Sequence, residues 1–131
     1  MHQILQPEGW PRPAGYAHGI AASGLQVYVS GQIGWTPAGR FEVSDLPGQV
    51  GQALRNAIAV LGEAGAAPEH VVRMTWYIVS REDYLANARA IGVAYREVMG
   101  KYFPAMSVVQ VGALLEPGAL VEIEVTAVVP A

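Results

Sequence analysis

The sequence has no cysteine and little charge. Among its 131 residues, Asp, Glu, Lys and Arg together make up only 15%, against roughly 25% in ordinary soluble domains. The absence of cysteine excludes a disulfide, a thiolate metal site and a cysteine nucleophile. Apolar residues make up 52% of the chain, which excludes a disordered protein. Because a domain of this size leaves much of its surface exposed, we expect another chain to cover part of the apolar surface.

Positive charge is scarce and scattered. Lys101 is the only lysine among eight basic residues, the formal net charge is −3 and the isoelectric point is near 5.5. Nucleic-acid binding requires clustered Lys and Arg, so the sequence argues against a nucleic-acid partner. The three histidines, His2, His18 and His70, do not have the spacing of metal ligands. We therefore expect no metal site.

Long apolar runs are also missing. No stretch approaches the roughly 18 uninterrupted apolar residues of a membrane-spanning helix, and the first residues lack the basic and apolar segments of a signal peptide. We therefore expect no membrane association and a cytoplasmic location. The length suits a single domain over residues 1–131, since domains most often run about 100–150 residues.

The periodicity of the apolar residues predicts strands and helices. Residues 25–30 alternate between apolar and polar side chains, as in a half-buried strand. Residues 45–66 carry apolar residues every three or four positions, which predicts a helix. The β-branched and aromatic residues at 70–80 predict another strand. Ser80 is predicted to cap a second helix that ends at Gly100.

The last third of the chain favours strands. Residues 106–115 and 120–129 are predicted as strands on either side of a turn at 116–118, and residues 2–5 as an additional strand. We therefore predict an α+β fold with two layers, in which two helices cover one face of a six-stranded mixed sheet. The other face of the sheet needs a cover, and the apolar surplus indicates that another subunit supplies it.

Four stretches in this order resemble one family. They are Gly-Tyr-Ala-His-Gly at 15–19, Val-Ser-Gly-Gln-Ile at 29–33, Phe-Pro-Ala-Met-Ser-Val-Val-Gln-Val at 103–111 and Val-Glu-Ile-Glu at 121–124. Together they are similar to the reactive intermediate (enamine/imine) deaminase family, RidA/YjgF, also catalogued as L-PSP translation-inhibitor endoribonucleases. The resemblance covers nearly the whole chain.

The resemblance implies a chorismate-mutase-like α+β fold and a homotrimer with three small-molecule clefts, one at each subunit boundary. In active members these clefts hydrolyse imines of the 2-aminoacrylate type to 2-oxo acids and ammonia. No metal or organic cofactor takes part.

Five positions correspond to the family's site, and four of them match it. Glu122 matches the carboxylate that positions water, so the resemblance implies a catalytic role. Tyr16 matches a cleft tyrosine, and Ser30 and Gly31 lie at a strand end beside the cleft, where they would hold the ligand. The alternative for Glu122 is a solvated strand face, and for Tyr16 a packing role. Ser30 has no visible base partner, which excludes a Ser–His–Asp nucleophile.

The fifth position, 106, departs from the family pattern. Members usually carry Pro-Ala-Arg-Ser, whereas this chain carries Pro-Ala-Met-Ser at 104–107. Met106 therefore stands where an arginine would bind the substrate carboxylate. A thioether has no charge and donates no hydrogen bond, and loss of such a partly buried charged contact costs about 2–5 kcal/mol. A methionine wall suits an apolar or adaptable ligand, so we expect an atypical substrate.

Other residues are candidates to compensate for the missing arginine. Arg89 falls close to a position where many members have a site-lining Asn, and His18 stands where the family often has Gln. For both, the alternative is a solvated surface side chain. Trp76 is expected in the core or in trimer packing.

Three functions remain open. The first is hydrolysis of an enamine or imine with an altered substrate, which the presence of Glu122 favours. The second is a trimer that binds a small metabolite without chemistry, which Met106 favours. The third is the endoribonuclease activity of the older family name, which the acidic isoelectric point, the single lysine and the lack of a histidine pair disfavour.

Overall fold

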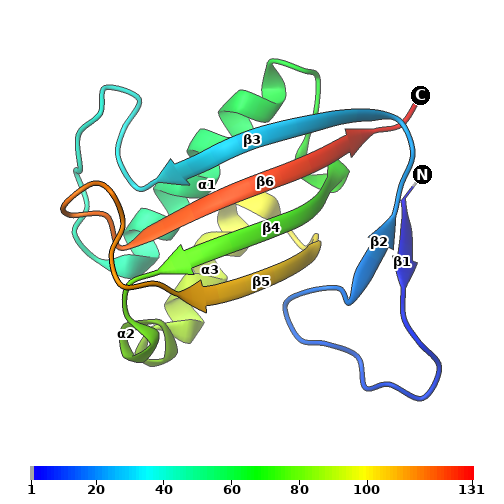
Figure 1. Cartoon of the computed structure of the whole chain (residues 1–131), viewed down its shortest axis with the longest axis horizontal. Helices are drawn as coiled ribbons and strands as arrows, with labels where there is room; N and C mark the ends of the chain where they lie inside the picture. The colour runs from blue at the N-terminus through cyan, green and yellow to red at the C-terminus, as the bar shows by residue number, and fades with distance from the viewer. Residues whose placement is uncertain (1) are drawn as a thin grey trace.

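A computed structural model describes residues 2–131 of the chain (Figure 1). Strands come first and last in the chain, and the α-helices and one further strand lie between them. The elements are β1 (Gln3–Leu5), β2 (Gly19–Ala21), β3 (Leu25–Ile33), α1 (Leu46–Gly62), a 3-10 turn (Pro68–His70), β4 (Val71–Ile78), α2 (Arg81–Ala86), α3 (Ala88–Met99), β5 (Ala105–Gln110) and β6 (Val121–Val129).

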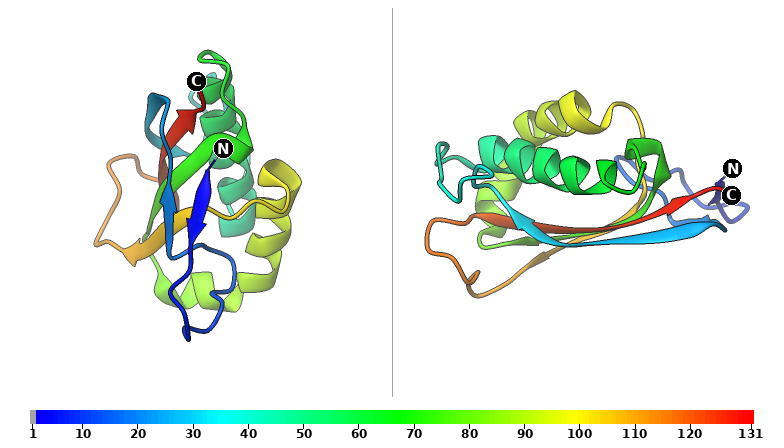
Figure 2. Two further views of the ribbon diagram at one scale, coloured as in Figure 1. Left: turned by 90° about the vertical axis from the view of Figure 1, so that its right-hand side faces the viewer. Right: turned by 90° about the horizontal axis from the view of Figure 1, so that it is seen from above.

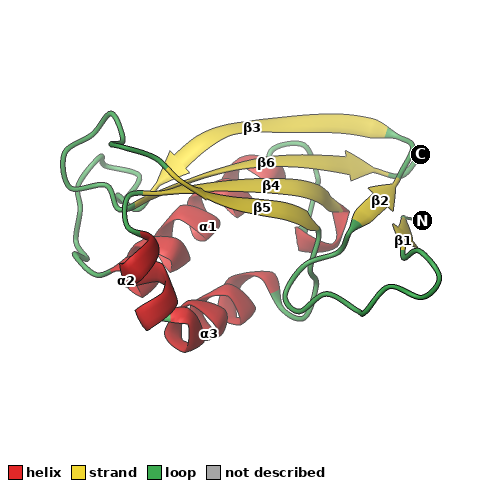
Figure 3. Cartoon of the chain, turned by 60° about the horizontal axis from the view of Figure 1, so that its bottom comes forward, coloured by secondary structure: helices red, strands yellow, loops and turns green. Residues whose placement is uncertain are grey.

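The main sheet has four strands in the order β3-β6-β4-β5. β4 and β5 are parallel, and the other neighbouring pairs are antiparallel. β1 and β2 pair only with each other and stand apart at one end of the main sheet (Figure 3). The α+β class and the mixed sheet are thus confirmed, but the single six-stranded sheet was wrong. The six strands form two sheets, because β1 and β2 pair with each other and not with a strand of the main sheet.

The strand predicted over residues 106–115 is shorter than expected. β5 ends at Gln110, which pairs with Ile78, the last residue of β4. One further backbone hydrogen bond, from Val111 N to the Ile78 oxygen at 2.8 Å, closes the pairing. β5 lies at the edge of the sheet, so no other strand pairs with residues 111–115. They continue as a loop instead.

The helices begin where the capping residues predict. Asp45 accepts a hydrogen bond from Gly48 N at 3.2 Å at the start of α1, and Ser80 accepts one from Asp83 N at 3.0 Å at the start of α2. The second predicted helix is interrupted at Asn87. Its side chain donates to the Asp83 backbone oxygen and carboxylate at 2.8 and 2.7 Å. Such local bonds compete with helix continuation and separate α2 from α3.

The hydrophobic core lies between the sheet and the helices on one of its faces (Figure 2). Trp76 is the largest buried side chain and is only 2% exposed, which confirms the core position predicted for it. In the described part of the chain, no helix lies against the other sheet face, and Tyr28 there is 70% exposed. Its coverage by another subunit stays a prediction. Within residues 2–131, no helix is long and apolar enough to cross a membrane.

Candidate functional site

The candidate site residues of the sequence fall on the two opposite faces of the sheet. Met106 pairs with Met74 and Trp76 pairs with Ile123, and these side chains face the helices. Glu122 pairs with Tyr77. Because neighbouring strand residues point to opposite faces, Glu122 lies on the open face. One chain therefore carries the carboxylate and the Met106 wall on different sides of its sheet.

Glu122 lies directly against Gly31. Val29 pairs with Val125 and Gln32 with Ile123, so two residues, Ser30 and Gly31, stand opposite one residue of β6. This is the pattern of a β-bulge. A Cβ atom added to Gly31 would lie 2.1 Å from Oε2 of Glu122. Glycine at position 31 therefore makes room for the carboxylate.

The other carboxylate of this strand already has a partner. The Tyr77 hydroxyl donates to Oε1 of Glu124 at 2.8 Å. This hydrogen bond, together with the nearby negative charges of Glu124 and Glu122, raises the pKa of Tyr77. Within residues 2–131, Glu122 forms no side-chain hydrogen bond or ion pair. Its carboxylate is free to accept a hydrogen bond from water or ligand.

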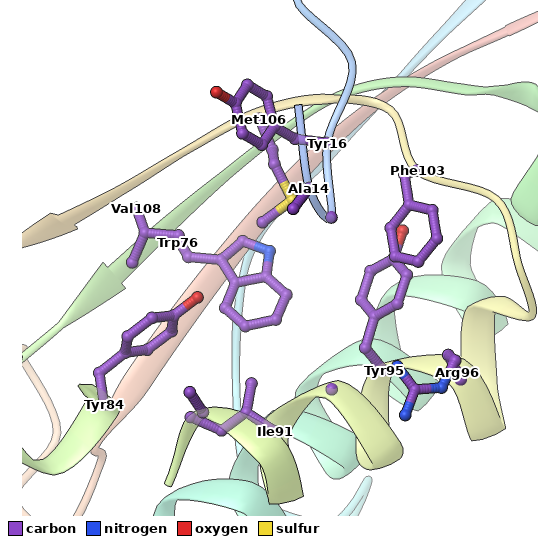
Figure 4. Close-up of a pocket in the computed structure, with 13 residues that line it drawn as sticks. Ala14, Tyr16, Trp76, Tyr84, Ile91, Tyr95, Arg96, Phe103, Met106 and Val108 are labelled. Atoms are coloured by element: carbon purple, nitrogen blue, oxygen red, sulfur yellow. The ribbon is translucent and has the colours of Figure 1, made fainter. Parts of the chain in front are cut away.

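A pocket of about 450 Å³ opens on the helix side of the sheet, between β4 and β5 and the helices α2 and α3 (Figure 4). It brings Tyr16 and Met106 together. Ala17 N donates to the Pro104 oxygen at 3.0 Å and Ala17 bridges to Ala105, which fixes the segment of Tyr16 beside β5. The pocket is lined by Ala14, Gly15, Tyr16, Trp76, Tyr84, Ala88, Ile91, Gly92, Tyr95, Arg96, Phe103, Met106 and Val108.

Aromatic rings form much of the pocket wall. Tyr95 stacks on Phe103 with 5.1 Å between ring centroids, and Trp76 lies 6.3 Å from Tyr95 at a tilted angle. The Tyr95 hydroxyl donates to the Tyr102 backbone oxygen. Burial raises the pKa of Tyr95 and of Tyr84, so both phenols are neutral at physiological pH. The wall suits a flat apolar group.

Among the described residues that line this pocket, Arg96 is the charged one. Sequence reasoning missed it. The sequence signal that could have found Arg96 is Gly92, which lies one helical turn earlier on the same helix face and leaves room for the guanidinium. The guanidinium Nη1 of Arg96 lies 3.3 Å from the place where a Cβ of residue 92 would stand. Arg89, the candidate from the sequence, is exposed on α3 and does not line the pocket. A ligand-binding role for Arg89 stays a prediction.

His18 packs beside Tyr16. The two rings meet edge to face with centroids 5.6 Å apart, and Trp10 meets His18 in the same manner at 5.0 Å. His18 is exposed and lies outside the pocket lining. Its contacts orient the tyrosine. In the described part of the chain, no cluster of three His, Asp or Glu residues could hold a metal ion.

Fold and site together define a small α+β protein with an aromatic pocket and a separate, free carboxylate. The chain belongs to the reactive intermediate deaminase (Rid) family, since the family model described as Endoribonuclease L-PSP matches residues 11–129. This confirms the resemblance seen in the sequence.

Individual relatives agree with this membership. The chain is 31% identical to a 2-iminobutanoate/2-iminopropanoate deaminase of Salmonella typhimurium, over 98% of both chains. A Rid-family crystal structure from Yersinia pestis matches with a TM-score of 0.84 and 34% identity, over 98% of both chains. The E. coli TdcF structure with bound serine matches with a TM-score of 0.68 and 29% identity, over 96% of this chain and 98% of that one.

Proposed function

We propose that this protein hydrolyses an enamine or imine to a carbonyl compound and ammonia, in a cleft formed between subunits. The observation that carries the proposal is the free Glu122 carboxylate, held over Gly31 at the β3 bulge. Its deaminase relative from Salmonella typhimurium supports the reaction class, and the serine in TdcF supports a small ligand of the amino-acid kind.

The chemistry requires a positioned water and a group that moves its proton. Glu122 accepts a proton from water as the water oxygen bonds to the imine carbon, and this gives a tetrahedral carbinolamine. The same proton then passes to the nitrogen. Glu122 next takes the hydroxyl proton of the carbinolamine and passes it to the nitrogen as the carbon–nitrogen bond breaks, so that the carbonyl forms and ammonia leaves. Ser30 and Gly31 lie beside the carboxylate and would hold the ligand there, since hydrogen-bond donors stabilise the developing charge.

The site requires more than one copy of the chain. Glu122 lies on the open sheet face, whereas Tyr16 and Met106 lie at the pocket on the helix side. A cleft that contains all three therefore combines the open face of one subunit with the pocket of the next. A homotrimer with three such clefts satisfies this requirement, because a head-to-tail interface that closes on itself forms a ring.

The substrate is atypical because position 106 holds no charge. Met106 forms part of an aromatic and apolar wall. This position gives a substrate carboxylate neither charge nor a hydrogen-bond donor. The same observation favours a second candidate function, a trimer that binds a small metabolite without converting it. Imine hydrolysis that depends on Glu122 would distinguish the hydrolase from the binding protein.

A substitution at Glu122 tests the proposal. Amino-acid oxidase with catalase generates imines from alanine and from phenylalanine, and semicarbazide traps whatever imine escapes hydrolysis. We expect wild-type protein to accelerate 2-oxo acid release. Glu122→Gln lowers this activity about 100-fold or more, since a positioned general base contributes roughly 10²–10⁴.

Glu124→Gln is the matched control, because it alters the neighbouring carboxylate on the same strand face. We expect it to retain activity within about three-fold, as its carboxylate is occupied by Tyr77. Full activity of Glu122→Gln would contradict the hydrolase. Inactive wild-type protein that still binds 2-oxo acids would establish the binding protein instead.

A further inference from the structure

The lining of the pocket on the helix side contains hydrogen-bond donors without partners among the described residues. It contains no negatively charged side chain. The indole nitrogen of Trp76 is a buried donor that no described acceptor pairs. Within residues 2–131, neither the Tyr84 hydroxyl nor the Arg96 guanidinium forms a hydrogen bond or ion pair. None of the thirteen lining residues is Asp or Glu. Such a lining favours a ligand that brings acceptors and negative charge.

Trp76 carries the strongest part of this argument. Its side chain is 2% exposed, and buried donors are nearly always paired in folded proteins. Figure 4 shows the indole nitrogen turned toward the pocket, next to the thioether of Met106. A methionine side chain is flexible and moves aside readily. A ligand that displaces it brings an acceptor to a donor that no described residue pairs.

Arg96 brings a positive charge to the pocket, which position 106 does not. It lines the pocket from α3, where it is exposed, and its guanidinium lies over Gly92, where a side chain would crowd it. Burial raises the pKa of Tyr84 above its ordinary value, and its phenol is a hydrogen-bond donor. The cationic side of the pocket thus lies on a helix, across from the strand position of Met106.

We propose that this pocket binds a carboxylate with an aromatic body, and that Arg96 takes the place of the missing strand arginine. The ring lies against Trp76, Tyr95 and Phe103, and the ligand's oxygens accept hydrogen bonds from Trp76 Nε1, Tyr84 and Arg96. This assignment rests on the proposed function: the substrate becomes the imine of an aromatic 2-amino acid. Its hydrolysis would release an aromatic 2-oxo acid and ammonia.

Calorimetric titration of the whole protein with three probes tests the assignment. Phenylpyruvate carries both ring and carboxylate, pyruvate lacks the ring, and phenylacetone lacks the carboxylate. We expect phenylpyruvate to bind at least about ten-fold more tightly than either of the other two, because burial of a ring and a charged hydrogen bond each contribute that much. Pyruvate binding as tightly as phenylpyruvate would overturn the assignment.

Arg96→Gln is expected to weaken phenylpyruvate binding about ten-fold and to leave phenylacetone binding unchanged. Arg81→Gln, an exposed arginine of α2 outside the pocket, is the matched control and changes both within about two-fold. Equal losses in the two variants would overturn the role of Arg96. Trp76→Phe keeps a ring but removes the N–H donor, and we expect several-fold weaker phenylpyruvate binding in protein whose circular dichroism remains native.

The outcome is separable from that of the proposed function. Tight phenylpyruvate binding with no loss of activity in Glu122→Gln contradicts the hydrolase and supports the pocket assignment. Hydrolysis that depends on Glu122 but shows no preference for the phenylalanine imine contradicts the pocket assignment and supports the hydrolase.

Discussion

At the scale of single residues, the pair of Gly31 and Glu122 is the most constrained feature of the candidate site. The sequence marked both residues, but not their contact. That contact depends on the bulge at Ser30 and Gly31, which brings the carboxylate over the glycine. A strand with regular alternation would not produce it, so spacing along the chain could not reveal it.

Gly31→Ala tests this contact. A Cβ at position 31 would lie 2.1 Å from Oε2 of Glu122, so the carboxylate must move. We expect imine hydrolysis to fall about ten-fold or more, because a displacement of about 1 Å in a catalytic group can cost 10²-fold. The measurement is the semicarbazide competition assay.

Gly112→Ala is the control for this change, since a Cβ at position 112 meets nothing within 4 Å. It should leave activity and melting temperature close to wild type. If Gly31→Ala retained full activity, the position of Glu122 would be irrelevant to the reaction.

Arg96 shows where residue-level reasoning fails. The position of an arginine on a helix follows from the sequence, but the pocket it lines is formed by β4, β5 and the segment of Tyr16 as well. Position counting therefore offered Arg89 as a candidate, which is exposed and does not line the pocket. Only the three-dimensional arrangement distinguishes the two arginines of α3.

At the scale of elements, the strongly periodic segments were predictable. Helix α1, strand β4 and strand β6 lie where apolar periodicity and capping residues predict them. The errors occur where partners far along the chain decide the outcome. β5 ends early because β4 ends there, and Asn87 divides the second helix through local hydrogen bonds. Neither cause is visible in the periodicity.

The start of α1 offers a prediction at this scale. Asp45 accepts from Gly48 N at 3.2 Å and satisfies one of the free amides of the first turn. Asp45→Ala should lower the free energy of unfolding by about 1 kcal/mol, whereas Asp45→Asn should change it little, because Asn caps nearly as well. Urea denaturation measures both. Equal stability of wild type and Asp45→Ala would show that the cap contributes nothing.

At the scale of the whole molecule, one arrangement explains two features. They are the low charge content of the chain and the position of Glu122 and Met106 on opposite faces of the sheet. The sheet has helices on one face, and its other face carries Glu122. Assembly would cover the open face and bring that carboxylate to the pocket of a neighbouring copy. The apolar surplus seen in the composition and the separation of Glu122 from Met106 then follow from the same arrangement.

The most direct test of this arrangement is complementation between two inactive variants. Glu122→Gln removes the carboxylate, and Ala88→Trp fills the pocket from an exposed helix position that lines it. Each variant alone should be inactive. Co-expressed in equal amounts, they should regain about a quarter of wild-type imine hydrolysis. An intact cleft needs Glu122 from one subunit and an unfilled pocket from the next, and random head-to-tail trimers provide both in about a quarter of their clefts. Mixed trimers without any recovered activity would contradict a site shared between subunits.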